Sequence, residues 1–375
     1  MRPDTIAEAV LAREDVAKFI EGSHGVKGDA ARTRVMEYLD ELQTTQRYGL
    51  YRALEYPLLP ILRKIERVGE HQPLAVDAVK KGRVVYASNH RSHIDYLVEP
   101  LVLDDAGLRP PIIAAGINLF GGPLGLIHKH VTGALPIRRN TKDPAYLITL
   151  KAYVSELLHK HDLFIYPEGG RSYSGELKPM KTGLLTACLD AQLPGLTLMP
   201  VAVSYDLVLE DHVLARQKVK RSQKAFSREI AELVRYAVGY RSRAFVTFGK
   251  PIALAGIDGD NKRALVDLTR HMRHEIGLLY KVRPTAVLAA AMKPSVTKSD
   301  LKARINGVLE ALHAANANVD LKSADQVLGE ATEPLATRNI IVVEQNRYRV
   351  RERNVLRYYA RSLAHLLSPP TSSTH

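Results

Sequence analysis

The segment Arg83-Val-Val-Tyr-Ala-Ser-Asn-His-Arg-Ser-His-Ile-Asp-Tyr96 passes from a short apolar run directly into a cluster of polar residues. A run of this length that is rich in valine is typical of a buried strand. His90 and Asp95 are five residues apart, which on a regular helix would leave them about 140° out of alignment. At a strand-to-helix junction, however, His90 is not yet helical, and Asp95 in the first helical turn can reach back to the imidazole. The segment therefore predicts a strand, a loop and a helix that bring His90 and Asp95 together.

Similar apolar runs recur along the middle of the chain. They alternate with segments whose apolar residues repeat with the periodicity of a helix. The clearest helix starts at Asp143-Pro144, an N-cap residue followed by proline at the first helical position. Strands that alternate with helices predict an α/β fold with a largely parallel mixed sheet flanked by helices. The further strands are expected at Ile112–Ala115, Ala134–Ile137, Leu163–Tyr166, Leu198–Val203 and Ala244–Phe248.

The same patterns divide the 375 residues into three parts. Residues 1–78 are expected to form a helical N-terminal region, residues 79–282 the α/β domain, and residues 283–375 a mainly helical C-terminal region. Within the last part, Arg338–Val350 favours a short β-hairpin. At about 100–200 residues per domain, a chain of 375 residues suits two or three domains, or one core with helical additions.

Composition narrows the class of protein. Hydrophobic residues make up 46% of the chain and charged residues 25%, which excludes global disorder. The single cysteine, Cys188, excludes an internal disulfide framework and suits a reducing compartment. The N-terminus carries acidic residues where a secretory signal would be apolar, so no signal peptide is expected. Prolines and glycines in the uncharged run Pro110–Ile127 favour a loop, in the protein or at a bilayer interface, over a membrane-spanning helix.

The net charge of +13 is unevenly distributed. Arg216–Arg243 holds nine basic and two acidic residues, and Arg338–Arg361 holds seven and two. Val84–Tyr205 is nearly balanced, with eleven basic and ten acidic residues. Such basic blocks suit nucleic acid, an anionic membrane surface or phosphate-bearing molecules, and solvated helix faces are the plainer interpretation.

Polar residues follow other predicted strands as well. Because open α/β sheets bind ligands at the carboxyl ends of their strands, we expect these residues to share one site. Arginine side chains there suit a phosphate dianion. Pro200 lies inside a predicted strand, where proline is more often an edge or bulge feature, so its role is either architectural or substrate-related. The residues that follow the strands are Arg138, Arg139, Glu168 and Arg171.

A carboxylate that orients a histidine forms the general-base arrangement of acyl transfer, here without a serine nucleophile. A turn-capping histidine beside an aspartate that begins a helix is the alternative. The chain has no G-x-S-x-G, Walker A, G-x-G-x-x-G or H-E-x-x-H motif. His271-x-x-His274 and His128-x-His130 lack a neighbouring cysteine or carboxylate cluster, so no metal site is expected.

Four blocks in order resemble those of the glycerolipid acyltransferases. They are Asn89-His-Arg-Ser-His-Ile-Asp95, Gly133-x-x-x-Ile-Arg-Arg139, Tyr166-Pro-Glu-Gly-Gly-Arg-Ser172 and Met199-Pro-Val201. Ile113–Leu119, Lys181-Thr-Gly183 and Leu356–Ser362 are similar to the membrane-associated, bacterial-type branch that acylates glycerol-3-phosphate. The resemblance covers residues 80–255 well, although Tyr166 stands where such enzymes more often carry Phe.

The resemblance implies transfer of a fatty acyl group to the sn-1 hydroxyl of glycerol-3-phosphate, giving lysophosphatidate in the first step of phospholipid synthesis. The donor would be acyl-CoA or acyl-acyl carrier protein, without any other cofactor. His90 would take the hydroxyl proton and Asp95 would position His90. The implied substrate contacts are phosphate binding by Arg138, Arg139 and Arg171, polyol binding by Glu168, and supporting roles for Gly169, Ser172, Lys181 and Pro200.

The basic blocks would then lie against anionic lipid headgroups or coenzyme A phosphates. This placement implies a peripheral or monotopic enzyme on the cytoplasmic face of the cell membrane, with acyl carrier protein as a further potential partner. No nucleic acid partner is expected. The alternatives are an acyltransferase for dihydroxyacetone phosphate or lysophosphatidate, a basic nucleic-acid-binding protein, and an acyltransferase-like protein without activity.

Overall fold

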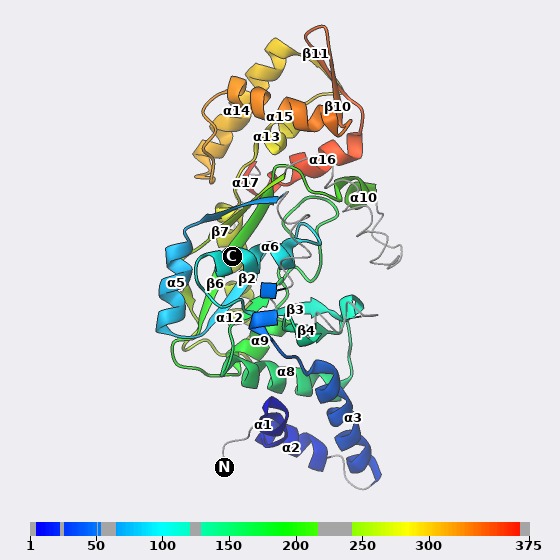
Figure 1. The fold of residues 1–375 in the computed structure, drawn as a ribbon, viewed down its shortest axis with the longest axis vertical. Coiled ribbons are helices and arrows are strands. Elements are labelled where there is room, and N and C mark those ends of the chain that lie inside the picture. The colour runs from blue at the N-terminus through cyan, green and yellow to red at the C-terminus, as the bar shows by residue number, and fades with distance from the viewer. Residues whose placement is uncertain are drawn as a thin grey trace.

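The computed structural model describes residues 5–22, 26–50, 52–53, 65–120, 129–216 and 242–367. Most of the basic block Arg216–Arg243 and the end of the uncharged run Pro110–Ile127 lie outside these residues. Three helices form the described N-terminal part: α1 (Ile6–Leu11), α2 (Glu14–Glu21) and α3 (Val26–Leu42). They lie at one end of the molecule and pack against α8 (Pro144–Leu158) (Figure 1).

The centre of the molecule is an eight-stranded mixed sheet of order β1-β7-β6-β2-β5-β3-β4, with β8 paired to β6. The strands β2 to β6 run parallel to one another, and β7 is antiparallel to β6. The predicted largely parallel α/β sheet is therefore confirmed. The strands are β1 (Ile65–Glu70), β2 (Val84–Ser88), β3 (Ile112–Gly116), β4 (Ala134–Ile137), β5 (Leu163–Ile165), β6 (Thr197–Tyr205), β7 (Ser242–Phe248) and β8 (Ile252–Ala253).

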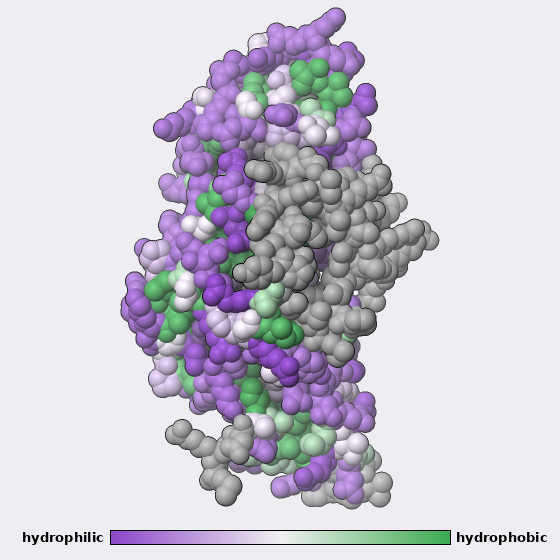
Figure 2. Space-filling model, in the orientation of Figure 1, coloured by the Kyte–Doolittle hydropathy of each residue, from purple (hydrophilic) through white to green (hydrophobic). Residues whose placement is uncertain are grey.

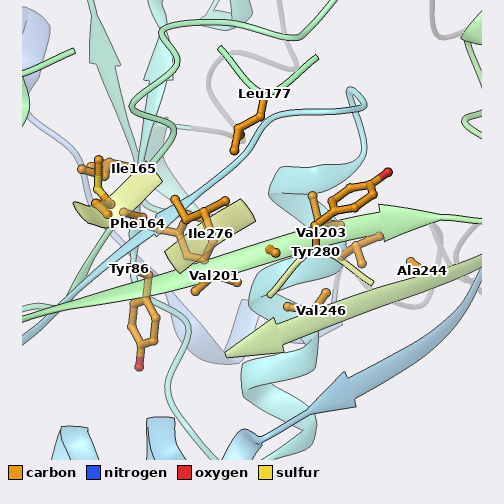
Figure 3. Close-up of a cluster of buried hydrophobic side chains, with 14 of the residues drawn as sticks. Tyr86, Phe164, Ile165, Leu177, Val201, Val203, Ala244, Val246, Ile276 and Tyr280 are labelled. Atoms are coloured by element: carbon orange, nitrogen blue, oxygen red, sulfur yellow. The ribbon is translucent and has the colours of Figure 1, made fainter. Parts of the chain in front are cut away.

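Helices cover the flanks of the sheet (Figure 1). The helices α5 and α6 contact β7, and α12 contacts β6. The start of α8 is as the sequence predicts, because Asp143 Oδ1 accepts a hydrogen bond from the amide of Ala145 and Pro144 opens the helix. Strand residues such as Tyr86, Phe164 and Val201 fill the core between the layers (Figure 3). The flanking helices are α5 (Gln72–Lys81), α6 (Asp95–Asp105), α9 (Gly183–Leu189), α10 (Asp211–Arg216) and α12 (Lys262–Leu279), and η1 (Ile117–Phe120) is a 3₁₀ turn.

The sheet begins earlier than expected. Its first strand, β1, lies within the part expected to be a helical region, and it pairs in parallel with β7. The strand is at the edge of the sheet, where only one side is paired and charged residues are tolerated. Its sequence, Ile-Glu-Arg-Val-Gly-Glu, therefore lacks the apolar run that marks the inner strands.

The C-terminal region is mainly helical and contacts the sheet domain through α10 and α16. The predicted hairpin is confirmed: β10 and β11 pair across Gln345-Asn346, both of which have positive φ, as in a tight hairpin turn. The short strand β9 joins β11 and was not predicted. The elements are α13 (Pro284–Ala291), β9 (Ser295–Thr297), α14 (Lys298–Ala314), α15 (Ala324–Thr337), β10 (Ile341–Glu344), β11 (Arg347–Val350), α16 (Arg353–Arg361) and α17 (Ala364–Leu367).

Pro200 lies in an inner strand rather than at an edge or bulge. It is opposite Ala87 of β2. On the other side of β6, pairing passes from β8 at Leu198 to β7 at Val201, so Pro200 stands where the antiparallel neighbour changes. Its missing amide is tolerated at this break, and its carbonyl still accepts a hydrogen bond from the amide of Gly249.

The surface seen in Figure 2 is largely hydrophilic, with apolar residues in small groups among the described part. Within the described residues, every helix is too short or too polar to cross a membrane.

Candidate active site

His90 and Asp95, which the sequence predicts to meet after β2, are in contact. The Nδ1 atom of His90 lies 2.8 Å from Oδ2 of Asp95. The chain leaves β2 at Ser88, and α6 begins at Asp95. The loop between them turns the Asp95 carboxylate back toward the imidazole. With Nδ1 directed at Asp95, Nε2 is the ring nitrogen left for other chemistry.

Asp95 is fully buried and receives four hydrogen bonds. Besides His90, the amides of Arg91 and Ser92 donate to Oδ2 at 2.6 and 2.9 Å. The hydroxyl of Tyr205, the last residue of β6, donates to Oδ1 at 2.6 Å. A buried carboxylate with this many donors is fixed in one orientation, and it can stabilise the positive charge of a protonated imidazole.

The His90 ring stacks on Tyr166, with ring centroids 4.4 Å apart. The Tyr166 hydroxyl donates to Oε2 of Glu99 at 2.7 Å, and Ser88 donates to the other oxygen of that carboxyl group. Burial and the neighbouring charge of Asp95 raise the pKa of Glu99 well above its ordinary value. Glu99 therefore holds its proton more strongly than an ordinary glutamic acid does.

Burial lowers the pKa of His90 below its ordinary value of 6.5, and Asp95 partly opposes this shift. The charges of Arg171 and His93 act in the same direction as burial. A lowered pKa keeps the imidazole neutral at physiological pH, which is the form that accepts a proton.

His90 lines a cavity of about 330 Å³ at the carboxyl ends of the parallel strands. Arg139 and Lys181 stand at its polar part together with His90. The rest of the lining is mostly apolar and comes from the strands and from α8 and α9. The apolar members include Ile113, Ile137, Ile165, Leu150, Leu184 and Ala187.

The two adjacent arginines after β4 separate into different environments. Arg138 forms a two-pronged ion pair with Glu41 of α3, with Nε 2.7 Å from Oε1. Its guanidinium also lies over the ring of Tyr38, 5.1 Å from the centroid. Arg139 has no hydrogen-bond or ion-pair partner among the described residues. Although both arginines line the cavity, only Arg139 is free to meet a ligand there.

Arg171 is not among the described residues that line the cavity, but its positive charge acts on both Arg139 and His90. Desolvation and the positive charge of Arg171 both lower the pKa of Arg139. The side chain of Arg171 is only 9% exposed, and its Nη1 lies 3.6 Å from Oε1 of the buried Glu210. The positive charge of Arg171 close to Arg139 favours the binding of an anion there.

The glycine pair after β5 makes room for these cations. Gly169 has φ of 71°, and a Cβ atom there would lie 2.7 Å from Cε of Lys181. A Cβ atom on Gly170 would lie 3.3 Å from Nη1 of Arg139. Glycine therefore permits both the turn and the close approach of Lys181 and Arg139.

Glu168 and Ser172 connect the turn after β5 to the start of the loop that joins His90 to Asp95. The carboxylate of Glu168 is buried and accepts from the amides of His90, at 2.9 Å, and Lys178, at 3.0 Å. The amide of Ser172 donates to the carbonyl of His90, and its hydroxyl donates to the carbonyl of Glu176. In this structure both side chains connect protein segments to each other. Neither is among the described residues that line the cavity.

Sequence reasoning missed Tyr205, Glu99 and Glu210. Tyr205 could have been found, because it follows Met199-Pro-Val201 on the same strand. Side chains alternate between the two faces of a strand, so Tyr205 lies on the same face as Met199 and Val201. Glu99 lies one helical turn beyond Asp95, which was also a usable signal. Glu210 lies in an irregular segment, and nothing local marks it. No group of three or more potential metal ligands occurs within the described ranges.

Comparison with known proteins agrees with the resemblance seen in the sequence. Residues 65–204 match the family model described as Acyltransferase. Curated relatives named glycerol-3-phosphate acyltransferase are 29% identical in Aeromonas hydrophila, 33% in Alteromonas mediterranea and 27% in Pseudoalteromonas atlantica. The alignments cover 92%, 66% and 98% of this chain. The four blocks predict a resemblance to acyltransferases, and residues 65–204 and these relatives support it.

The chain spans 47%, 31% and 52% of the length of these three relatives. A solved structure, the 1-acyl-sn-glycerophosphate (LPA) acyltransferase PlsC from Thermotoga maritima, aligns over 72% of this chain and 94% of its own. Its TM-score is 0.33 at 13% sequence identity. The strand order and the strand registers of this chain define its fold.

Proposed function

We propose that this chain, whose residues 65–204 match the Acyltransferase family, transfers a fatty acyl group from a thioester to the sn-1 hydroxyl of glycerol-3-phosphate. The product is lysophosphatidate, and the donor is acyl-CoA or acyl-acyl carrier protein. The observation that carries the proposal is the oriented His90–Asp95 pair, at a cavity that also contains the unpaired cation Arg139. The names of the curated relatives support glycerol-3-phosphate as the acceptor.

The reaction needs a base for one proton and no covalent enzyme intermediate. Nε2 of His90 takes the proton from the acceptor hydroxyl as the oxygen attacks the thioester carbonyl carbon. The new C–O ester bond forms, the C–S bond breaks, and the departing thiolate takes the proton back from His90. Asp95 stabilises the imidazolium between these two proton transfers.

The phosphate of the acceptor is assigned to Arg139, with Arg171 and Lys181 nearby. A phosphate dianion would relieve the repulsion between the two guanidinium groups, and it would accept charge-assisted hydrogen bonds. Arg138 is left out of this set because Glu41 already holds it. The apolar wall of the cavity suits the acyl chain, which gains by leaving water.

A comparison of three acceptors tests the assignment of glycerol-3-phosphate as the substrate. Release of free thiol from acyl-CoA is measured with glycerol-3-phosphate, dihydroxyacetone phosphate or lysophosphatidate as the acceptor. We expect the highest kcat/KM with glycerol-3-phosphate. Turnover with one of the other two acceptors but not with glycerol-3-phosphate would reject the substrate while keeping the chemistry, and no thiol release with any acceptor would reject the activity.

An anionic membrane surface is the proposed site of action, on the cytoplasmic face and in a peripheral or monotopic manner. Arg353, Arg357 and Arg361 lie on the exposed side of α16, whose other side is buried. Arg361 is paired with Glu176 at 3.4 Å, whereas Arg353 and Arg357 have no ion-pair partner among the described residues. Each basic residue near an anionic surface contributes about 1 kcal/mol.

Vesicle flotation tests the membrane assignment. We expect binding to anionic vesicles and weaker binding to zwitterionic ones, and the double variant Arg353→Glu/Arg357→Glu should reduce the anionic preference. Lys262→Glu/Arg263→Glu at the exposed start of α12 makes the same change in charge elsewhere. Equal binding to both kinds of vesicle would overturn the membrane assignment, as would equal losses from the two double variants.

A further inference from the structure

The buried carboxylate of Glu210 lies next to both the loop between His90 and Asp95 and the side chain of Arg171. Oε1 of Glu210 accepts a hydrogen bond from the amide of His93 at 2.6 Å, and Oε2 accepts from the hydroxyl of Ser92 at 2.8 Å. These two residues belong to the loop that joins His90 to Asp95. The same Oε1 atom lies 3.6 Å from Nη1 of Arg171, which follows β5. Glu210 therefore links the catalytic loop to one of the phosphate-site cations.

The position of Glu210 is itself fixed. Its side chain is 1% exposed, and a buried carboxylate is tolerated only while its partners stay in place. Asp206, four residues earlier, is held by Arg243 and Arg283. Asp211, the next residue, accepts hydrogen bonds from Arg338 and from the hydroxyl of Tyr359.

These anchors come largely from the C-terminal region. Tyr359 of α16 also accepts a hydrogen bond from the amide of Val208 at 3.0 Å. Its neighbour Tyr358 packs close to the loop after β5, since a Cβ atom on Gly175 would overlap the carbonyl of Tyr358. The segment Leu356–Ser362 thus contacts both the Glu210 segment and the loop after β5.

We propose that Glu210 is a positioning residue that sets the location of Arg171 relative to His90. The inference rests on the proposed function, because glycerol-3-phosphate carries its phosphate and its reacting hydroxyl on one small molecule. Once the phosphate is bound, the distance between the cation and the base decides whether that hydroxyl reaches Nε2 of His90. Misplacement by about 1 Å is sufficient to reduce the rate about 10²-fold.

The test is a double-mutant cycle of Glu210→Gln and Arg171→Ala, measured as kcat and KM for glycerol-3-phosphate. In the wild-type background, Glu210→Gln should lower kcat by about 10–100-fold while KM changes by less than about 3-fold, because Arg171 keeps its charge but not its position. In the Arg171→Ala background, the same substitution should cost little, since the group that it positions is gone.

A purely structural role for Glu210 gives a different pattern. Equal losses from Glu210→Gln in the two backgrounds, or a rise in KM without a fall in kcat, would overturn the inference. Glu70→Gln is the matched control and should leave both constants unchanged. The carboxylate of Glu70 lies on the edge strand β1 and is bound to Lys281. Glu210→Asp, which keeps the charge on a shorter side chain, replaces Glu210→Gln in the cycle if the latter does not fold. Turnover by the wild type without coupling rejects this inference alone, whereas no turnover with any acceptor rejects the proposed function.

Discussion

The hydroxyl of Tyr205 donates a 2.6 Å hydrogen bond to Oδ1 of Asp95, so β6 supports the residue that orients the His90 ring after β2. The two residues are 110 positions apart and meet because β2 and β6 are neighbouring parallel strands that end at the same edge of the sheet. The orientation of Asp95 therefore depends on the sheet as well as on its own loop.

We expect Tyr205→Phe to lower kcat by about 5–30-fold and to destabilise the fold by about 1–3 kcal/mol, because a buried acceptor loses its donor. Steady-state kinetics and thermal unfolding measure the two effects. Tyr153→Phe is the matched control, because among the described residues the Tyr153 hydroxyl accepts a hydrogen bond from the amide of Thr44 alone, at 3.2 Å. A Tyr205 variant with unchanged kcat would show that Asp95 needs no support from β6.

The two arginines after β4 should behave differently. Arg139→Ala should raise KM for glycerol-3-phosphate by about 10–100-fold, because hydrogen bonds to a charged group contribute about 1.5–3 kcal/mol. Arg138→Ala should change KM by less than about 3-fold and reduce stability by at most about 1 kcal/mol, because it loses a partly exposed ion pair with Glu41. Equal effects of the two substitutions on KM would contradict this division of roles.

The pH dependence of kcat/KM should report His90. Its pKa is lowered below 6.5, so activity should rise with pH through an inflection below that value, as the base loses its proton. Asp95→Asn removes a group that raises the pKa of His90, and we expect the inflection to move to still lower pH together with a loss of rate. An inflection above 6.5 in the wild type would contradict the burial of a neutral imidazole.

Glu99 should make stability depend on pH. Its carboxyl group holds a proton more tightly in the folded chain than in the unfolded one, so stability should fall as pH rises from the ordinary pKa of 4.5 toward the raised value. Glu99→Gln resembles the protonated form and should flatten this dependence in thermal unfolding measured at increasing pH above 4.5. The exposed Glu37→Gln should leave the slope of the wild type intact, and a Glu99 variant with that same slope would show that Glu99 is not the group responsible.

Much of this arrangement was accessible from local sequence. The junction after Ser88 predicted the contact of His90 with Asp95, because both residues belong to one short segment between a strand and a helix. The inner strands were also predicted, since strands covered on both faces read as continuous apolar runs. The edge strand β1 was not, because it carries charged residues, is only partly buried and lacks a continuous apolar run.

The remaining contacts depend on distances that no local pattern encodes. Arg138 was grouped with Arg139 as a phosphate ligand because both follow β4. The structure differs because α3, about a hundred residues earlier in the chain, carries Glu41 to within hydrogen-bond distance of Arg138. Glu210 meets Ser92 and Arg171 only after β6, β2 and β5 have assembled, so its role emerges from the tertiary structure alone.

The most direct test of the central claim compares acyl transfer to glycerol-3-phosphate by the wild type, His90→Ala and the exposed control His159→Gln. Removal of one general base should lower kcat by about 10²–10⁴-fold. We expect that loss for His90→Ala, with a folded variant by thermal unfolding, and a wild-type rate for His159→Gln. A wild-type rate for His90→Ala would show that His90 is not the base and would contradict the mechanism proposed for this site.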